Sequence, residues 1–171
     1  MSRIVVISVL FVFLLSACNK EKRLLKDLNK KEWSIETSKR WVIYNDGSTL
    51  LYEDLTDAGT IYIYNDPTSV LEFKEIRMVY TNYLGFTIDF TTPLYANKDG
   101  TRIGMAGALC NSPFECDLVW NVEESSNRKQ TWSSFGSNDT FFFPPDVYNA
   151  NQEHHLKWEI TLKKVGKYTV E

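Results

Sequence analysis

Apolar and polar residues alternate with a period of two along most of the chain from Trp33 onward. The segment from Phe114 to Val122 carries an apolar residue at every second position, and the segment from Leu156 to Leu162 repeats the pattern. This is the period of a β-strand with one buried face. The same period places four apolar residues on one face of a first strand and three on one face of a later strand: Trp33, Ile35, Trp41 and Ile43, and Phe86, Ile88 and Phe90.

Turn signals separate these alternating segments at hairpin spacing. Asn45-Asp46-Gly47-Ser48 and Lys98-Asp99-Gly100 contain the Asp-Gly pair that tolerates the positive φ of tight hairpin turns. No convincing long helix follows residue 32, and eight or nine antiparallel strands are expected. The fold class predicted for residues 32–171 is therefore a single all-β domain, an up-and-down antiparallel barrel, with a β-sandwich as the alternative.

The first residues have the order of a secretory signal. Arg3 precedes an apolar run from Ile4 to Leu15, and the small residues Ser16 and Ala17 follow. The run is about a dozen residues, whereas a membrane-spanning helix needs roughly 20. Residues 1–17 are thus expected to be a signal peptide. In the tether at 18–31, Leu24, Leu25 and Leu28 suit one face of a short helix, with an unstructured spacer as the alternative.

Leu15-Ser16-Ala17-Cys18 resembles the lipobox of bacterial lipoproteins. The resemblance implies that Cys18 becomes the new N-terminus and carries acyl chains such as palmitate, which anchor the protein in a membrane. Because Asn19 rather than Asp follows the cysteine, it also favours the outer membrane, and the face that the domain occupies stays open. Two or three acyl chains give stable anchoring, which one chain does not.

Charge and cysteine content agree with an exported protein. The chain has 19 Lys and Arg against 22 acidic residues, and loss of Arg3 leaves 18 against 22, a net charge of −4. This balance argues against a nucleic-acid partner, which would require a basic excess. Cys110 and Cys116 flank a short turn, and an even pair in an oxidising compartment predicts a disulfide bond.

No catalytic motif is recognisable, so the sequence predicts a protein that is not an enzyme and needs no cofactor. His154 and His155 are the chain's two histidines. Adjacent residues of an extended segment point to opposite sides, so no metal site is expected there.

Two aromatic features suggest contacts with other molecules. Phe141, Phe142 and Phe143 lie in a long loop between Gly136 and His154, where they either cap one barrel end or form an exposed partner contact. Tryptophans that stack on sugar rings must be exposed. Trp132, beside Ser133 and Ser134, is the best candidate, whereas core packing is expected for Trp120 and the other strand tryptophans.

A short N-terminal helix, Trp33 at the start of the first strand, an up-and-down strand series and a final Trp158-x-Ile160-x-Leu162 strand resemble the lipocalin-like lipoproteins of Bacteroidetes-type bacteria. In this chain Lys31 stands where lipocalins have the glycine of their Gly-x-Trp motif. The resemblance implies a calycin-type barrel, with Trp33 as the residue that closes it, able to hold one small apolar molecule.

Two functions are therefore expected. The first is a lipid-anchored binding protein whose small apolar ligand enters at a barrel mouth, lined by Trp41, Phe86, Phe90 and Trp120. The alternative is an interaction module that docks a protein or a glycan through its surface or through the loop containing Phe141, Phe142 and Phe143.

Overall fold

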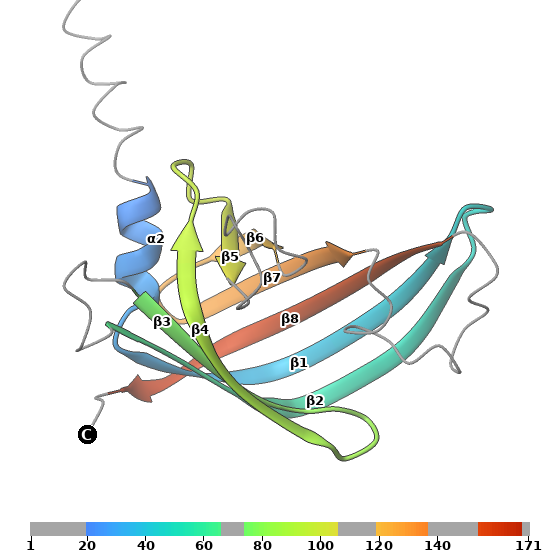
Figure 1. The fold of residues 1–171 in the computed structure, drawn as a ribbon, viewed down its shortest axis with the longest axis horizontal. Coiled ribbons are helices and arrows are strands. Elements are labelled where there is room, and N and C mark those ends of the chain that lie inside the picture. Colours follow the sequence, from blue (N-terminus) through green and yellow to red (C-terminus); the bar gives the residue numbers. More distant parts are fainter. Residues whose placement is uncertain (1–19, 66–73, 106–118, 137–153, 169–171) are drawn as a thin grey trace, which may run out of the picture.

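The computed structural model describes residues 20–65, 74–105, 119–136 and 154–168 (Figure 1). Within these ranges, one helix precedes eight strands. Their bounds are α2 Lys20–Leu28, β1 Lys31–Tyr44, β2 Thr49–Asn65, β3 Lys74–Thr81, β4 Thr87–Ala96, β5 Arg102–Met105, β6 Val119–Ser125, β7 Lys129–Gly136 and β8 His154–Lys167.

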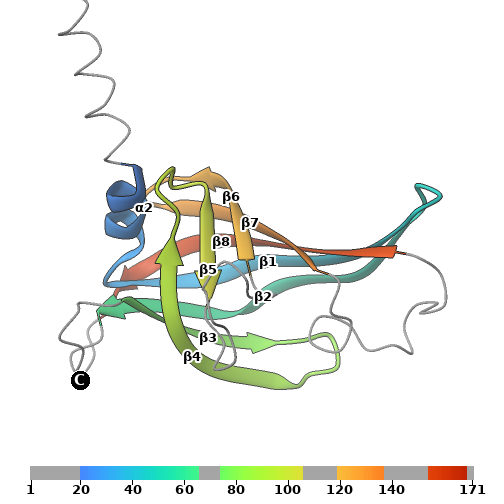
Figure 2. The ribbon, with the colours of Figure 1, turned by 45° about the horizontal axis from the view of Figure 1, so that its top comes forward.

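The strands form one closed barrel in the order β1-β2-β3-β4-β5-β6-β7-β8, and all neighbours are antiparallel. Closure comes from β1, which pairs with β2 along one edge and with β8 along the other. The all-β up-and-down barrel is confirmed, with eight strands, and the sandwich alternative is wrong. β1, β2 and β8 are the longest strands and extend beyond the short β5, β6 and β7 (Figures 1 and 2).

Antiparallel order gives the barrel two distinct ends. At the mouth lie the β1–β2 turn and the β3–β4 turn, together with the adjoining ends of β5 to β8. At the closed end lie α2, the β4–β5 and β6–β7 turns, and the last residues of β8 (Figure 2). The Asp-Gly turns expected from the sequence are both present, with Gly47 at φ 84° and Gly100 at φ 65°.

Helix α2 covers the closed end. Leu24 and Leu28, one turn apart, are buried in the same core as the barrel residues, and Leu25 packs against it. Trp33 lies beside them, and its indole nitrogen donates a 3.5 Å hydrogen bond to the Leu28 carbonyl oxygen. A nine-residue helix is marginal alone, so packing on the barrel is what stabilises α2. This helix occupies most of residues 18–31, for which the sequence left a short helix and an unstructured spacer as alternatives.

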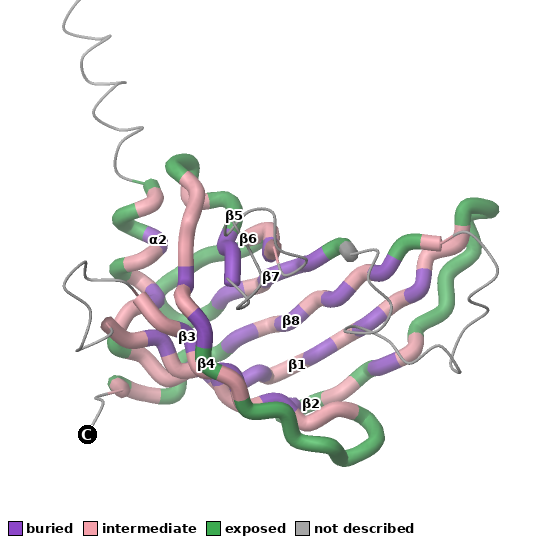
Figure 3. The backbone as a smooth tube through the Cα atoms, viewed as in Figure 1, coloured by how far each residue is buried: buried purple, intermediate pink, exposed green. Residues whose placement is uncertain are grey.

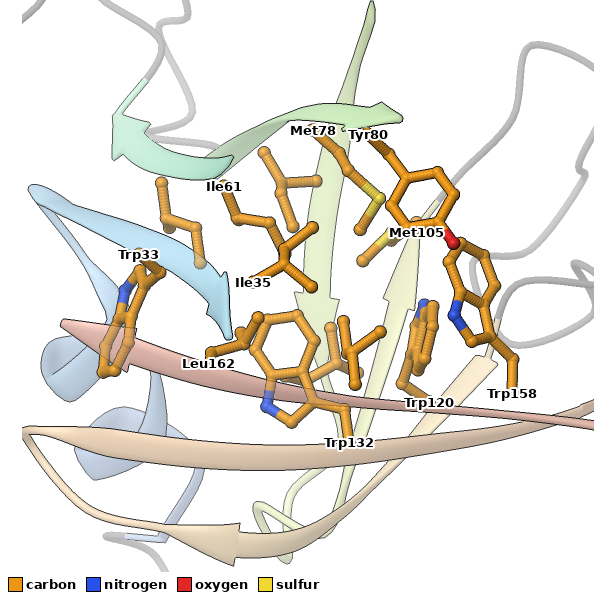
Figure 4. Close-up of a cluster of buried hydrophobic side chains, with 14 of the residues drawn as sticks. Trp33, Ile35, Ile61, Met78, Tyr80, Met105, Trp120, Trp132, Trp158 and Leu162 are labelled. Atoms are coloured by element: carbon orange, nitrogen blue, oxygen red, sulfur yellow. The ribbon is translucent and has the colours of Figure 1, made fainter. Parts of the chain in front are cut away.

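The core fills the barrel interior from the closed end toward the mouth (Figures 3 and 4). Buried and less buried residues alternate along β1, β3 and β8, as one-face burial requires (Figure 3). The largest fully buried side chains of the barrel belong to β1, β2, β3, β6 and β7: Trp33, Ile35, Ile61, Ile63, Ile76, Met78, Tyr80, Trp120 and Trp132.

A β-bulge changes which face of β1 is buried. The register shifts between Ile35 and Thr37 against both neighbouring strands. Beyond this shift the buried residues of β1 are Ser38, Arg40 and Val42. Trp41 therefore lies on the outer face, where the Lys157 Nζ is 4.9 Å from its ring centroid. The expectation that Trp41 and Ile43 share the inward face of Trp33 and Ile35 is wrong, because the bulge inverts the alternation.

Gly59 lies where β2 begins to pair with β3, opposite Tyr80. Its φ is +149°, and a Cβ built on it would lie 2.0 Å from the carbonyl oxygen of Val79. Gly59→Ala should therefore reduce the free energy of unfolding by about 1–3 kcal/mol through backbone strain. Gly166→Ala is the matched control, since a Cβ there meets no atom within 4 Å, and it should change stability by less than about 0.5 kcal/mol. Equal urea midpoints for the two variants would contradict this reading.

Several expected features lie outside the described residues. They are the signal peptide at 1–17, the acylation site Cys18, the cysteine pair Cys110 and Cys116, and the loop residues Phe141, Phe142 and Phe143. Within the described ranges, no helix has the length and apolar character needed to cross a membrane.

Candidate functional site

A pocket opens inside the barrel toward the mouth. Side chains from β1, β3, β4, β5, β6 and β8 line it, and they are mostly aromatic or apolar: Arg40, Met78, Tyr80, Ile88, Phe90, Met105, Trp120 and Trp158. Ile88 is 46% exposed, whereas Trp120 at the inner side is fully buried. The pocket thus leads from solvent to the aromatic core shown in Figure 4.

A buried ion pair borders this pocket. Arg40 of β1 faces Glu53 of β2 across the strand pair, with 3.1 Å between Arg40 Nε and Glu53 Oε1. Their side chains are only 7% and 0% exposed. An ion pair removed from water in this way is costly unless further hydrogen bonds satisfy the charges.

Neighbouring groups supply such hydrogen bonds to the carboxylate of Glu53. The Tyr80 hydroxyl donates to Glu53 Oε1, and the Tyr83 backbone N–H donates to Glu53 Oε2 at 3.2 Å. Ser38 Oγ lies 3.0 Å from the Tyr80 hydroxyl and accepts a 2.9 Å hydrogen bond from the indole nitrogen of Trp158. Four strands are thereby linked through one polar network inside the barrel.

Aromatic rings enclose the cation of this network. The Arg40 guanidinium carbon lies 4.1 Å from the ring centroid of Trp158 and 5.0 Å from that of Tyr80. Burial raises the pKa of the Tyr80 phenol well above its usual value. Tyr80 is therefore a neutral hydrogen-bond donor at physiological pH, and the carboxylate of Glu53 accepts from it.

Trp120 contributes a buried indole N–H group to the lining of the pocket. Its ring is fully buried, and none of the residues that the structure describes accepts a hydrogen bond from its indole nitrogen. Figure 4 shows the nitrogen-bearing side of the ring turned toward Met105. A buried donor left unpaired costs about 1–3 kcal/mol, so this group favours an acceptor placed in the pocket.

The free volume of the pocket is small. The space open to the centres of water molecules is about 20 Å³, and one water needs roughly 10–15 Å³ on this measure. The interior is therefore largely filled by side chains. Met78 and Met105 form part of the wall, and methionine side chains adapt their shape readily because they have three rotatable bonds and no branch.

The structure separates the residues that the sequence proposed as ligand contacts. Phe90 and Trp120 both line the pocket. Trp41 lies on the outer face of β1, and Phe86 is 66% exposed in the β3–β4 turn, where its backbone N–H donates to Asn82 Oδ1. The interior positions expected for Trp41 and Phe86 are wrong. No ligand contact is tested by these placements.

The expectation of an exposed Trp132 is also wrong. Its ring is fully buried, and its indole nitrogen donates to Gln130 Oε1 at 3.4 Å. The neighbouring Ser134 hydroxyl donates to the Val119 carbonyl oxygen at 2.9 Å. Because the Ser134 hydroxyl has a hydrogen-bond partner, this part of β7 can be buried. Trp132 therefore presents no exposed ring to a sugar.

Sequence reasoning missed Ser38, Arg40, Glu53 and Tyr80 as a group. Ser38, Glu53 and Tyr80 are 15 to 42 residues apart, and Trp158 is 120 residues from Ser38. No local motif connects such positions. The one available signal is that Tyr80 continues the inward alternation of Ile76 and Met78 on β3.

Metal binding finds no support in the part of the chain that the structure describes. No group of three or more His, Cys, Asp or Glu side chains there could hold an ion. His154 packs edge-on against Tyr44 at 6.4 Å between ring centroids, and His155 is exposed.

Comparison with known proteins gives structural likenesses only. No family profile matches the chain, and no curated protein matches it. A lipocalin-like protein from Bacteroides uniformis is 11% identical with a TM-score of 0.37, covering 81% of this chain and 99% of its own. Apocrustacyanin C1 and lobster apocrustacyanin A1 are each 12% identical with a TM-score of 0.38, covering 87% of this chain and 71% of theirs.

Proposed function

We propose that this chain is a lipid-anchored, non-enzymatic binding protein of the bacterial cell envelope, and that its barrel mouth takes a small apolar molecule bearing a hydrogen-bond acceptor. The observation that carries the proposal is the buried indole N–H of Trp120, which has no hydrogen-bond acceptor among the described residues and lies beside a pocket that opens to solvent. An acceptor at this position would remove the cost of the unpaired donor.

The shape of the pocket sets the size of the bound group. Drug-sized ligands occupy cavities of about 300–1,000 Å³, far more than the space present. The adaptable walls at Met78 and Met105 and the exposed edge at Ile88 support entry of a flat or slender apolar end. The rest of such a molecule would lie at the mouth.

The lipobox-like sequence supports anchoring at Cys18. Helix α2 begins at Lys20, so Asn19 alone separates it from Cys18. Acyl chains on that cysteine would hold the domain at a membrane. The outer membrane is the proposed site, because Asn19 follows the cysteine.

Native mass spectrometry of the gently purified mature protein tests the ligand. We expect a reproducible additional mass that is lost on denaturation, and the released compound should be apolar with a carbonyl, carboxyl or similar acceptor. A bound molecule lacking any acceptor would contradict the role of Trp120. A protein without added mass, even after incubation with an extract of the native envelope, would contradict the binding function.

Trp120→Phe should weaken binding of the captured compound while keeping the aromatic lining. Loss of one neutral hydrogen bond is worth about 0.5–1.5 kcal/mol, roughly two- to tenfold in Kd. Trp41→Phe is the matched control, because the same change is made on the outer face, and it should leave Kd unchanged. Isothermal titration calorimetry of both variants distinguishes them. Equal affinities would show that Trp120 does not donate to the ligand.

Exposed apolar residues at the mouth favour one second candidate, an interaction module. Leu84 is 54% exposed and Phe86 is 66% exposed in the β3–β4 turn, and Leu51 on β2 is 47% exposed. Clustered apolar surface of this kind is typical of contact sites for other proteins. Leu84→Ser with Phe86→Ser would abolish a partner contact of this turn but leave ligand affinity in the Trp120 pocket intact.

A further inference from the structure

The outward side of α2 is strongly basic. Leu24 and Leu28 face the core, whereas four cationic residues of the helix are exposed: Lys20, Lys22, Arg23 and Lys26. The two acidic residues of the helix, Glu21 and Asp27, are partly buried. A nine-residue helix thus presents four positive charges to solvent at the closed end of the barrel.

The strands beneath α2 add further positive charge at the same end. Lys167 pairs directly with Lys31, Lys164 pairs with Trp33, and the Lys164 backbone N–H donates to the Arg128 carbonyl oxygen at 2.9 Å. Partial burial lowers the pKa of Lys31, the negative charge of Asp27 raises it, and the positive charge of Lys164 lowers it. Figures 1 and 2 both place the end of β8 and α2 at the same end of the barrel.

Most of these charges are not neutralised locally. Lys129 and Lys163 form ion pairs with Glu124 and Glu36, at 2.9 Å and 3.5 Å. Within the described ranges, no ion pair involves Lys164 or Lys167. Like charges that face each other across a strand pair, as Lys31 and Lys167 do, are destabilising. The chain as a whole is acidic, with a net charge of −3. Positive charge is therefore concentrated at the closed end, although the chain as a whole is acidic.

An apolar side chain lies within this basic surface. Val165 is 61% exposed between Lys164 and Lys167. Cationic side chains with an exposed apolar residue among them match the interface of an anionic bilayer, where headgroups are negative and the acyl boundary is close.

We infer that the closed end of the barrel, with the outward side of α2 and the end of β8, binds the anionic lipid headgroups of the membrane surface. Charge complementarity supports this partner, and so does the place of Cys18 just before α2 in the sequence. In the sequence, Cys18 precedes Lys20, the first residue of α2, by two positions. Acyl chains on Cys18, the anchor proposed above, would enter the bilayer beside this surface.

The test uses the chain from residue 18 onward with Cys18→Ser, which cannot be acylated and contains every described element. The probes are vesicles of pure phosphatidylcholine and vesicles with 30% phosphatidylglycerol. We expect co-sedimentation with the anionic vesicles only, and its loss at high salt, because the attraction falls off within a Debye length. Equal binding to both vesicles, or to neither, would overturn the inference while leaving anchoring through Cys18 untouched.

Two charge-reversal variants locate the surface. Lys22→Glu with Lys26→Glu should weaken binding to the anionic vesicles by about 30-fold or more, at roughly fivefold for each basic residue lost. Lys39→Glu with Lys157→Glu makes the same charge change on β1 and β8 nearer the mouth and should alter binding less than threefold. Equal effects of the two pairs would assign the attraction to net charge and overturn the proposed surface.

A third variant guards against a folding defect. Lys164→Glu with Lys167→Glu leaves α2 unchanged and should weaken binding like the α2 pair. Far-ultraviolet circular dichroism and the melting temperature check that each variant keeps the barrel. If the α2 pair fails to fold, wild-type affinity from the β8 pair overturns the inference.

Discussion

Replacing Glu53 with Gln should lower the free energy of unfolding by about 3–5 kcal/mol, the usual cost of breaking a buried ion pair from one side. The substitution keeps the size of the side chain but leaves the Arg40 guanidinium charged between the rings of Trp158 and Tyr80. Since domains of this size are stable by only about 5–15 kcal/mol, the urea midpoint should fall steeply.

Two comparisons make this experiment specific. Asp54→Asn alters the neighbouring pair of the same two strands, Lys39 with Asp54, whose side chains are 38% and 47% exposed. It should cost less than about 1 kcal/mol. Arg40→Met combined with Glu53→Gln removes both buried charges and should be at least as stable as Glu53→Gln alone. A single Glu53→Gln variant within 1 kcal/mol of the wild type would show that Arg40 finds compensation elsewhere.

Trp33→Ala should cost about 3–5 kcal/mol, because a fully buried tryptophan is removed from the closed end. Its ring packs in the same core as Leu24 and Leu28 of α2, so the cavity would also loosen the helix. Urea unfolding followed by circular dichroism measures the loss, and helix protection can be followed by amide hydrogen exchange.

Trp41→Ala is the informative partner of this variant, since both residues lie on β1. On the outer face, Trp41 loses only its contact with Lys157 and partial burial, worth about 1 kcal/mol. The face assignment made from sequence alone would require similar, large losses for the two tryptophans. Equal losses would therefore show that the β1 bulge does not turn Trp41 outward.

The barrel was predictable because its signals are local. Alternation with period two and turn residues such as Asp46-Gly47 each act within a few positions of the chain, and the structure follows them at the β1–β2 turn. Phe90 was placed correctly because β4 keeps one phase from end to end. Trp120 was placed correctly because it lies before the register shift between Val122 and Glu124 of β6.

The phase of β1 could not be read from the sequence. Past the bulge, the outward residues Trp41 and Ile43 are apolar, whereas the inward residues Ser38 and Arg40 are polar. Simple alternation therefore favours the wrong face. The polar residues are tolerated inside because Glu53 and Tyr80 satisfy them, and these partners come from other strands. Long-range compensation of this kind leaves no trace in a window of a few residues.

The same limit explains the error at Trp132. Trp132 lies beside Ser133 and Ser134 in the sequence, and these polar neighbours suggested exposure. In the barrel, the Ser133 hydroxyl donates to Glu123 and the Ser134 hydroxyl to the Val119 carbonyl oxygen, both on β6. Exposure depends on whether neighbouring strands supply partners, and that depends on tertiary structure.

The pairing of β1 with β8 has a consequence for how the chain folds. The first strand acquires its second partner only when the last strand is present, and residues such as Lys31 and Lys167 must meet across nearly the whole chain. Closing so long a loop costs entropy before any contact repays it, so such topologies fold slowly. A chain emerging N-terminus first from a ribosome therefore stays open until β8 arrives. Until then one edge of β1 is unpaired and available to other strands, which makes protection of the nascent chain part of its biogenesis.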